Sequence, residues 1–166
     1  GDIRIGASSV STVLRSNPYY RWGGVKELSV ESDEQISYIR FDLSSLNRFM
    51  SGSDIDLDIS KVILWLYLTT HQDEEETIKV DILPAAGRWE DSSVSWNNPP
   101  DAQDAFYVDS FVAKGVEIGL VLIQVDVTSA FINNSYDTAT FKLYAEPTSN
   151  GVYSFASREW EEGESI

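Results

Sequence analysis

The sequence contains no cysteine, and it has only one methionine, Met50, and one histidine, His71. Without cysteine the chain forms no disulfide and offers no thiolate as a nucleophile or a metal ligand. A Gly-x-Ser-x-Gly nucleophile elbow and a glycine-rich phosphate loop are also missing. These absences exclude a disulfide-stabilised scaffold and several common classes of enzyme.

Basic residues are scarce, because 12 Lys and Arg stand against 27 Asp and Glu, for a formal net charge of −15. Such a field repels the phosphate backbone of nucleic acid and an anionic membrane surface. We therefore expect no nucleic-acid partner. The excess carboxylates have two interpretations: a solvated acidic surface, or a group of oxygen ligands that binds calcium or another cation.

Long hydrophobic runs are absent as well. The longest, Val62 to Leu68, has the length of a strand, whereas a membrane span needs about 20 apolar residues. We therefore expect no membrane insertion. With 166 residues, of which 42% are hydrophobic, the chain is long enough to bury a core as one domain, residues 1–166.

Apolar and polar residues alternate with a period of two along several short segments, and clusters of Gly, Pro, Asn and Ser separate these segments. This pattern is typical of half-buried strands joined by turns. It predicts an all-β fold, an antiparallel two-sheet β-sandwich. The inward positions predict a core that contains Ile39, Phe41, Leu64, Leu66, Ile82, Val125, Val127, Leu143 and Phe155.

The outward positions of the same strands carry aromatic and basic side chains. Aromatic planes stack on the C–H faces of sugars, and Lys and Arg pair with carboxylates. The alternative is cross-strand aromatic pairing under a loop, with ordinary solvated charges. The predicted ligand-binding face consists of Tyr38, Arg40, Trp65, Tyr67, Lys79, Lys142, Tyr144 and Arg158, with Tyr20 and Trp22 of the loop 19–22 at its rim.

Several motifs occur in a specific order along the chain. They are Tyr38-Ile-Arg-Phe-Asp-Leu43, Trp89-Glu-Asp-Ser-Ser-Val-Ser-Trp-Asn-Asn-Pro99, Val125-Asp-Val-Thr128 and Phe155-Ala-Ser-Arg-Glu159. Over nearly the whole chain the sequence resembles the DNRLRE-type domain, which is similar to carbohydrate-binding module family 96 and to disaggregatase-related surface repeats. The resemblance implies a jelly-roll-like sandwich and the binding of alginate. It also implies that the domain is extracellular and is fused to a polysaccharide-degrading enzyme or a surface protein.

Two tryptophans of the longest motif, Trp89 and Trp96, favour a structural role, as a core anchor before a tight Asn-Asn-Pro-Pro corner. No set of nucleophile, base and stabilising group emerges from the sequence. The single histidine, His71, lies just before an acidic hairpin tip. We therefore predict no catalytic residues.

Alternating acids at 54, 56 and 58 indicate either an edge strand with outward charges or part of a calcium loop. Asp2 and Asp126 are further candidate calcium ligands. Apart from a structural calcium ion, we expect no cofactor.

The sequence thus favours a non-catalytic carbohydrate-binding module that binds an acidic polysaccharide such as alginate. One alternative is a structural or adhesive repeat of a cell-surface protein, in which a sheet edge pairs with a neighbouring domain. A small polysaccharide lyase or hydrolase is a third reading.

Overall fold

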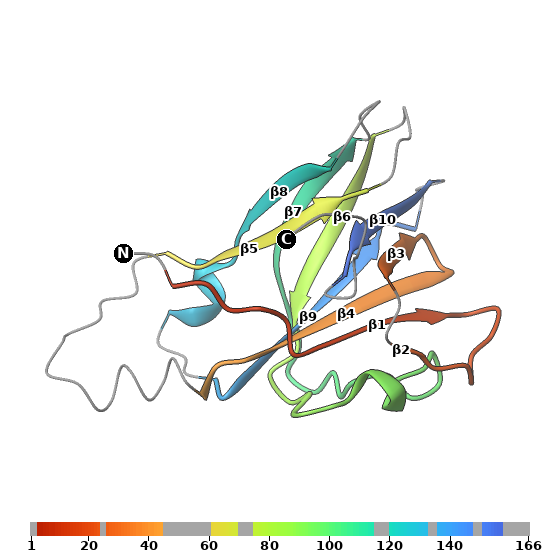
Figure 1. Cartoon of the computed structure of the whole chain (residues 1–166), viewed down its shortest axis with the longest axis horizontal. Coiled ribbons are helices and arrows are strands. Elements are labelled where there is room, and N and C mark those ends of the chain that lie inside the picture. The colour runs from red at the N-terminus through yellow and green to blue at the C-terminus, as the bar shows by residue number, and fades with distance from the viewer. Residues whose placement is uncertain are drawn as a thin grey trace, which may run out of the picture.

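The computed structural model describes residues 3–23, 26–44, 61–69, 75–114, 120–132, 136–147 and 151–157. These residues confirm the all-β prediction and include ten strands and two short 3₁₀ helices (Figure 1). The elements are β1 (Ser9–Leu14), β2 (Trp22–Gly23), β3 (Glu27–Glu31), β4 (Gln35–Asp42), β5 (Ile63–Leu68), β6 (Glu75–Ile82), η1 (Asp91–Ser93), β7 (Phe106–Lys114), β8 (Val121–Asp126), η2 (Thr128–Phe131), β9 (Thr138–Ala145) and β10 (Val152–Ala156). Within this part of the chain, no helix is long and apolar enough to cross a membrane.

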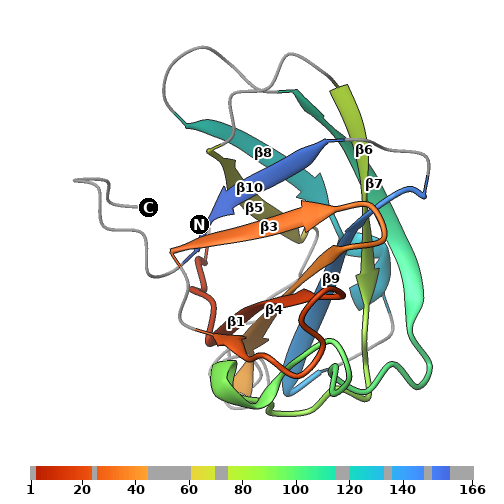
Figure 2. The same cartoon turned by 90° about the vertical axis from the view of Figure 1, so that its right-hand side faces the viewer.

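The strands form one antiparallel sheet in the order β7-β6-β9-β4-β3-β10-β5-β8, and β1 pairs with β4 and with the short β2. The sheet curves so strongly that its two end strands, β7 and β8, come close together, and it nearly closes into a barrel (Figure 2).

The predicted two-sheet sandwich is therefore not confirmed. A single registered pair, Glu31 with Gln35, joins β3 to β4, and another, Phe155 with Leu68, joins β10 to β5. These narrow joints connect what would otherwise be separate layers. A period of two in the sequence reports which face of a strand is buried, but not which strands share an edge.

The main core fills the interior of the curved sheet and confirms the strand phases. Of the predicted core residues all are buried except Phe41, which is partly buried and packs against the core. Phe111 of β7 and Phe155 of β10 meet edge to face across the interior, with ring centroids 5.9 Å apart. Because inward positions are fixed in this way, the intervening residues of each strand must point outward.

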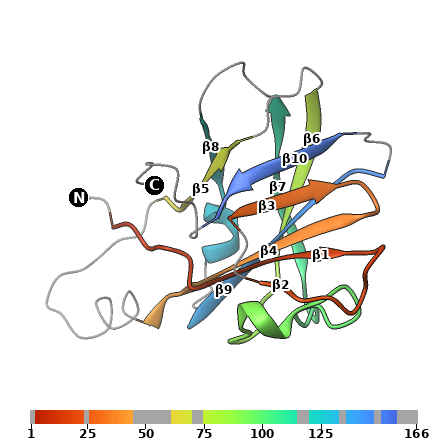
Figure 3. The ribbon, with the colours of Figure 1, turned by 45° about the vertical axis from the view of Figure 1, so that its right-hand side comes forward.

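A second, smaller core lies on the outer side of β1 and β4. Residues 83–96, here called the covering segment, fold over these strands and include η1, which lies beside β1 and β2 (Figure 3). Leu83, Trp89 and Val94 of the segment pack there against Val13 and Tyr38. The structural interpretation of Trp89 is confirmed: it is buried, and its Nε1 donates a hydrogen bond to Thr140 Oγ1 at 2.9 Å.

Candidate functional site

The covering segment buries two residues of the predicted binding face. Tyr38 and Arg40 do lie on the outer side of β4, but both are buried, and the expectation that they face solvent is wrong. Arg40 Nε donates to the carbonyl of Trp89 at 3.1 Å, and its Nη2 donates to Ser9 Oγ at 2.9 Å. Arg40 therefore fastens the covering segment to the sheet.

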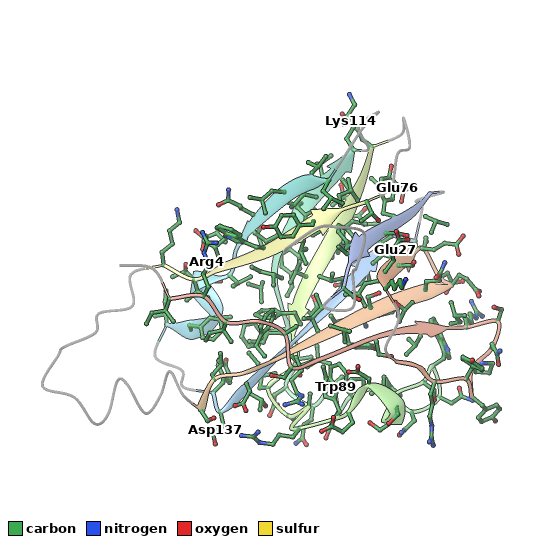
Figure 4. The ribbon with its side chains drawn as sticks, viewed as in Figure 1. Arg4, Glu27, Glu76, Trp89, Lys114 and Asp137 are labelled. Atoms are coloured by element: carbon green, nitrogen blue, oxygen red, sulfur yellow. The ribbon has the colours of Figure 1, made fainter. Side chains whose placement is uncertain are left out.

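Trp65 and Tyr67 lie on a different side of the molecule from the other predicted residues. Both point outward from β5, which sits between β10 and β8 and does not neighbour β4, β6 or β9. Trp65 is 40% exposed, and the guanidinium of Arg4 lies 4.4 Å from its ring centroid (Figure 4). The single face predicted from the sequence is therefore divided between two separate regions on the outer surface of the curved sheet.

Of the two rim residues, Tyr20 belongs to the loop between β1 and β2, and Trp22 begins β2. Tyr20 is exposed there, and the backbone amide of Asn97 holds the loop by donating to the carbonyl of Pro18 at 2.9 Å. Trp22 pairs with Thr12 through β2, while its side chain lies outside the described residues. Outside them as well lie Arg158, His71, Asp2 and the three alternating aspartates Asp54, Asp56 and Asp58.

Three of the predicted residues come together on neighbouring strands. Lys79 of β6 stands opposite Tyr144 of β9, and Lys142 of β9 stands opposite Asp81 of β6. On the other edge of β6, Asp81 pairs with Tyr107 of β7. We call this surface the tyrosine–lysine face; its members are Lys79, Asp81, Tyr107, Lys142, Tyr144 and Glu146.

Direct contacts link the members of this face. Tyr144 Oη donates to Asp81 Oδ1 at 2.9 Å, and Lys142 Nζ lies 4.9 Å from the centroid of the Tyr144 ring. Lys79 Nζ lies 3.5 Å from Glu146 Oε1. A cation this close to an aromatic face is attracted by the ring quadrupole. The network therefore fixes the ring of Tyr144 and places an ammonium group directly over it.

The tyrosine hydroxyl in this network remains protonated at ordinary pH. Partial burial, and then the hydrogen bond to Asp81 and the negative charges of neighbouring groups, raise the pKa of Tyr144 to about 12. All three effects disfavour the phenolate. The hydroxyl therefore stays a hydrogen-bond donor to Asp81.

Tyr107 belongs to this face but was not among the binding residues predicted from the sequence. Its side chain is 54% exposed. The register between β6 and β7 shifts at Val80 and Asp81, so simple alternation does not assign the face of the residues beyond this irregularity. The available signal was a tyrosine within the strand-forming run Phe106-Tyr-Val108, but the direction of its side chain depends on that shift.

The tyrosine–lysine face combines ring surfaces with balanced charge. Lys79 and Lys142 offset Asp81 and Glu146, in a chain whose net charge is −15. Aromatic surface with fixed donors and acceptors beside it suits a ligand that has apolar C–H faces and many hydroxyl groups.

A metal centre is not visible in the described ranges, which contain no group of three or more His, Cys, Asp or Glu residues able to hold an ion. Asp126, a candidate ligand from the sequence, instead accepts hydrogen bonds from Thr128 N at 3.0 Å and Thr128 Oγ1 at 2.6 Å. These bonds hold the pKa of its carboxyl below the usual value. Its carboxylate is therefore tied to Thr128, the first residue of η2.

Comparison with known proteins identifies the family to which the chain is similar. Residues 6–165 match the family model described as carbohydrate-binding module family 96, which confirms the resemblance to that family over nearly the full length. A search of curated proteins found no match to the sequence.

Proposed function

The chain belongs to carbohydrate-binding module family 96, and on that premise we propose that it binds an acidic polysaccharide such as alginate through the tyrosine–lysine face. The observation that carries the proposal is the contact between Lys142 and the ring of Tyr144, with Lys79 and Tyr107 on the adjoining strands. Ring surface and ammonium groups are thus available to one sugar residue at the same time.

Each member of the face has a separate task. The rings of Tyr107 and Tyr144 would pack against the C–H faces of sugar rings. The ammonium of Lys142 would neutralise a uronate carboxylate, and Asp81 would accept a hydrogen bond from a sugar hydroxyl. Each exposed ion pair contributes about 1 kcal/mol or less, so affinity depends on several contacts made together.

We expect binding without cleavage. The two carboxylates of the face are already engaged, Asp81 with the Tyr144 hydroxyl and Glu146 with Lys79. The proposal includes an extracellular location, where such polysaccharides occur, and fusion to a catalytic domain or a surface protein.

Alanine variants on the face test the proposal. We expect Lys142→Ala and Tyr107→Ala each to weaken binding to alginate about fivefold, the equivalent of about 1 kcal/mol. Affinity electrophoresis in gels that contain alginate or a neutral glucan measures the loss.

The matched control is Lys114→Ala, which removes an exposed lysine from the far end of β7, where it pairs with Glu75. Folding of every variant is checked by thermal unfolding. If Lys142→Ala and Tyr107→Ala both retain full affinity while folded, the ligand does not bind on this face.

A further inference from the structure

A second surface on the outer side of β5 and β8 is not used by the proposed function. In the register of these strands, Trp65 stands opposite Gln124 and Tyr67 stands opposite Leu122. Leu64, Leu66 and Leu68 alternate with the two aromatics and are buried in the core. We call the outward group, with Arg4, the arginine–tryptophan face; its members are Arg4, Trp65, Tyr67, Leu122 and Gln124.

Arg4 brings a positive charge to one end of this face. Its exposed guanidinium lies 4.4 Å from the centroid of the Trp65 ring. A guanidinium stacked on an aromatic ring keeps its in-plane N–H groups free for other partners, and those groups match both oxygens of a carboxylate. The stacked Arg4 is therefore a preset hydrogen-bond donor for an anionic group beside an aromatic surface.

The remaining members extend the surface away from Arg4. Trp65 and Tyr67 are two residues apart on one strand, so their positions are about 6.6 Å apart along it. Trp65 and Leu122 are 40% and 39% exposed, and Gln124 is also exposed. The face thus offers apolar surface, an amide and a cation within a few ångströms of one another.

The two faces lie on different parts of the curved sheet. In the strand order, β4, β3 and β10 separate β9 from β5, and β7 lies between β6 and β8 where the sheet nearly closes. The outward side chains of the two faces therefore point in different directions.

We propose that the arginine–tryptophan face is a second carbohydrate-binding site, which takes an acidic sugar with its carboxylate on Arg4 and its C–H face on Trp65 and Tyr67. This proposal rests on the proposed function, because it assumes that the module binds acidic polysaccharide. Two separate sites make the chain bivalent, so that it links two polysaccharide chains instead of coating one.

Calorimetry with an alginate tetrasaccharide tests the number of sites. We expect two tetrasaccharides per chain for the unmodified protein. Arg4→Ala and Leu122→Glu should each leave one, bound at the tyrosine–lysine face, whereas Lys142→Ala should keep two and weaken the tetrasaccharide at the tyrosine–lysine face about fivefold. The matched control Arg15→Ala removes an exposed arginine that pairs with Asp33 and belongs to neither face, and it should keep two at unchanged affinity.

Light scattering with long alginate chains tests bivalency. The unmodified protein should raise scattering by linking chains, while folded Arg4→Ala should still bind alginate but raise scattering no further than a monovalent binder. Unchanged scattering and stoichiometry in both Arg4→Ala and Leu122→Glu would overturn the second site and leave the proposed function intact. If these two variants lose all binding while Lys142→Ala loses none, this result would support the arginine–tryptophan face and overturn the tyrosine–lysine face.

Discussion

At the scale of single residues, Arg40 shows how a buried cation serves folding in a chain that has few cations. Its guanidinium donates to the Trp89 carbonyl and to Ser9 Oγ, and its Nη2 lies 3.9 Å from Glu90 Oε1, whose side chain is exposed. A buried charge is tolerated when fixed acceptors replace the water that it loses. In the proposed second site the same residue type, Arg4, would instead donate to a bound ligand.

Replacement of Arg40 should therefore reduce stability rather than affinity. We expect Arg40→Ala to lower the free energy of unfolding by about 2–3 kcal/mol, because hydrogen bonds to a charged donor and the packing of its stem are lost. Urea unfolding measures the change, with Arg88→Ala as the control. Arg88 pairs with Asp42 at the surface, and its loss should cost less than about 1 kcal/mol. An Arg40→Ala protein of normal stability that binds alginate weakly would contradict this role.

The raised pKa values of two tyrosines predict that the protein loses stability at alkaline pH. Burial raises the pKa of Tyr38 to about 12 from its ordinary value of 10.0, and Tyr144 reaches about 12 as well. The folded state thus holds these protons more tightly than the unfolded state, so their contribution is complete below pH 10 and is lost as pH rises toward 12. Unfolding in urea at a series of pH values should show this decline, and Tyr38→Phe should make it shallower. A decline as steep in Tyr38→Phe as in the unmodified protein would contradict the assignment to Tyr38.

At the scale of elements, the covering segment is the part of the fold that the sequence did not reveal. Alternation identified the buried side of β4 and β9, because side-chain direction follows from local backbone geometry. The outer side of β4 is buried by contacts between residues far apart in sequence, such as Arg40 with Trp89, which no local period encodes. Tyr38 and Arg40 were misplaced for this reason, whereas Lys142 and Tyr144, further along the same outer side, stay accessible.

Strand order had a similar effect on the candidate site. The outward direction of Trp65 and Tyr67 followed from alternation, and the structure agrees with it. Their separation from Lys79 and Tyr144 depends on β5 pairing with β10 and β8, which the residues of β5 do not specify on their own. Sequence alone therefore identified side chains for two faces but joined them into one.

The hydrogen bond between Trp89 and Thr140 should be needed to hold the covering segment in place. Trp89→Phe keeps an aromatic ring but leaves the buried Thr140 Oγ1 without its indole donor, which should cost about 1–3 kcal/mol of unfolding free energy. In a double-mutant cycle with Thr140→Val, the two losses should be non-additive by about 1 kcal/mol. Strictly additive losses would show that the bond contributes nothing to the fold.

At the scale of the whole molecule, the net charge of −15 sets how the chain responds to ions. Calcium binding remains a prediction: carboxylates on the loops of a β-sheet domain can tie those loops together through an oxygen-liganded ion. We expect calcium to raise the melting temperature, and a chelator to lower it, by more than magnesium does at equal ionic strength, since a specific ion stabilises the state that binds it. Equal effects of the two cations would remove the case for a structural calcium ion.

The location of the ligand on the tyrosine–lysine face is tested most directly by nuclear magnetic resonance. Titration of labelled protein with an alginate tetrasaccharide should shift the backbone amides of Lys79 to Asp81 and of Lys142 to Tyr144, and the Lys142→Ala variant should need about fivefold more tetrasaccharide to reach the same shifts. Shifts that spare both of these strands and fall on the loop around Tyr19 and Tyr20 would contradict the account.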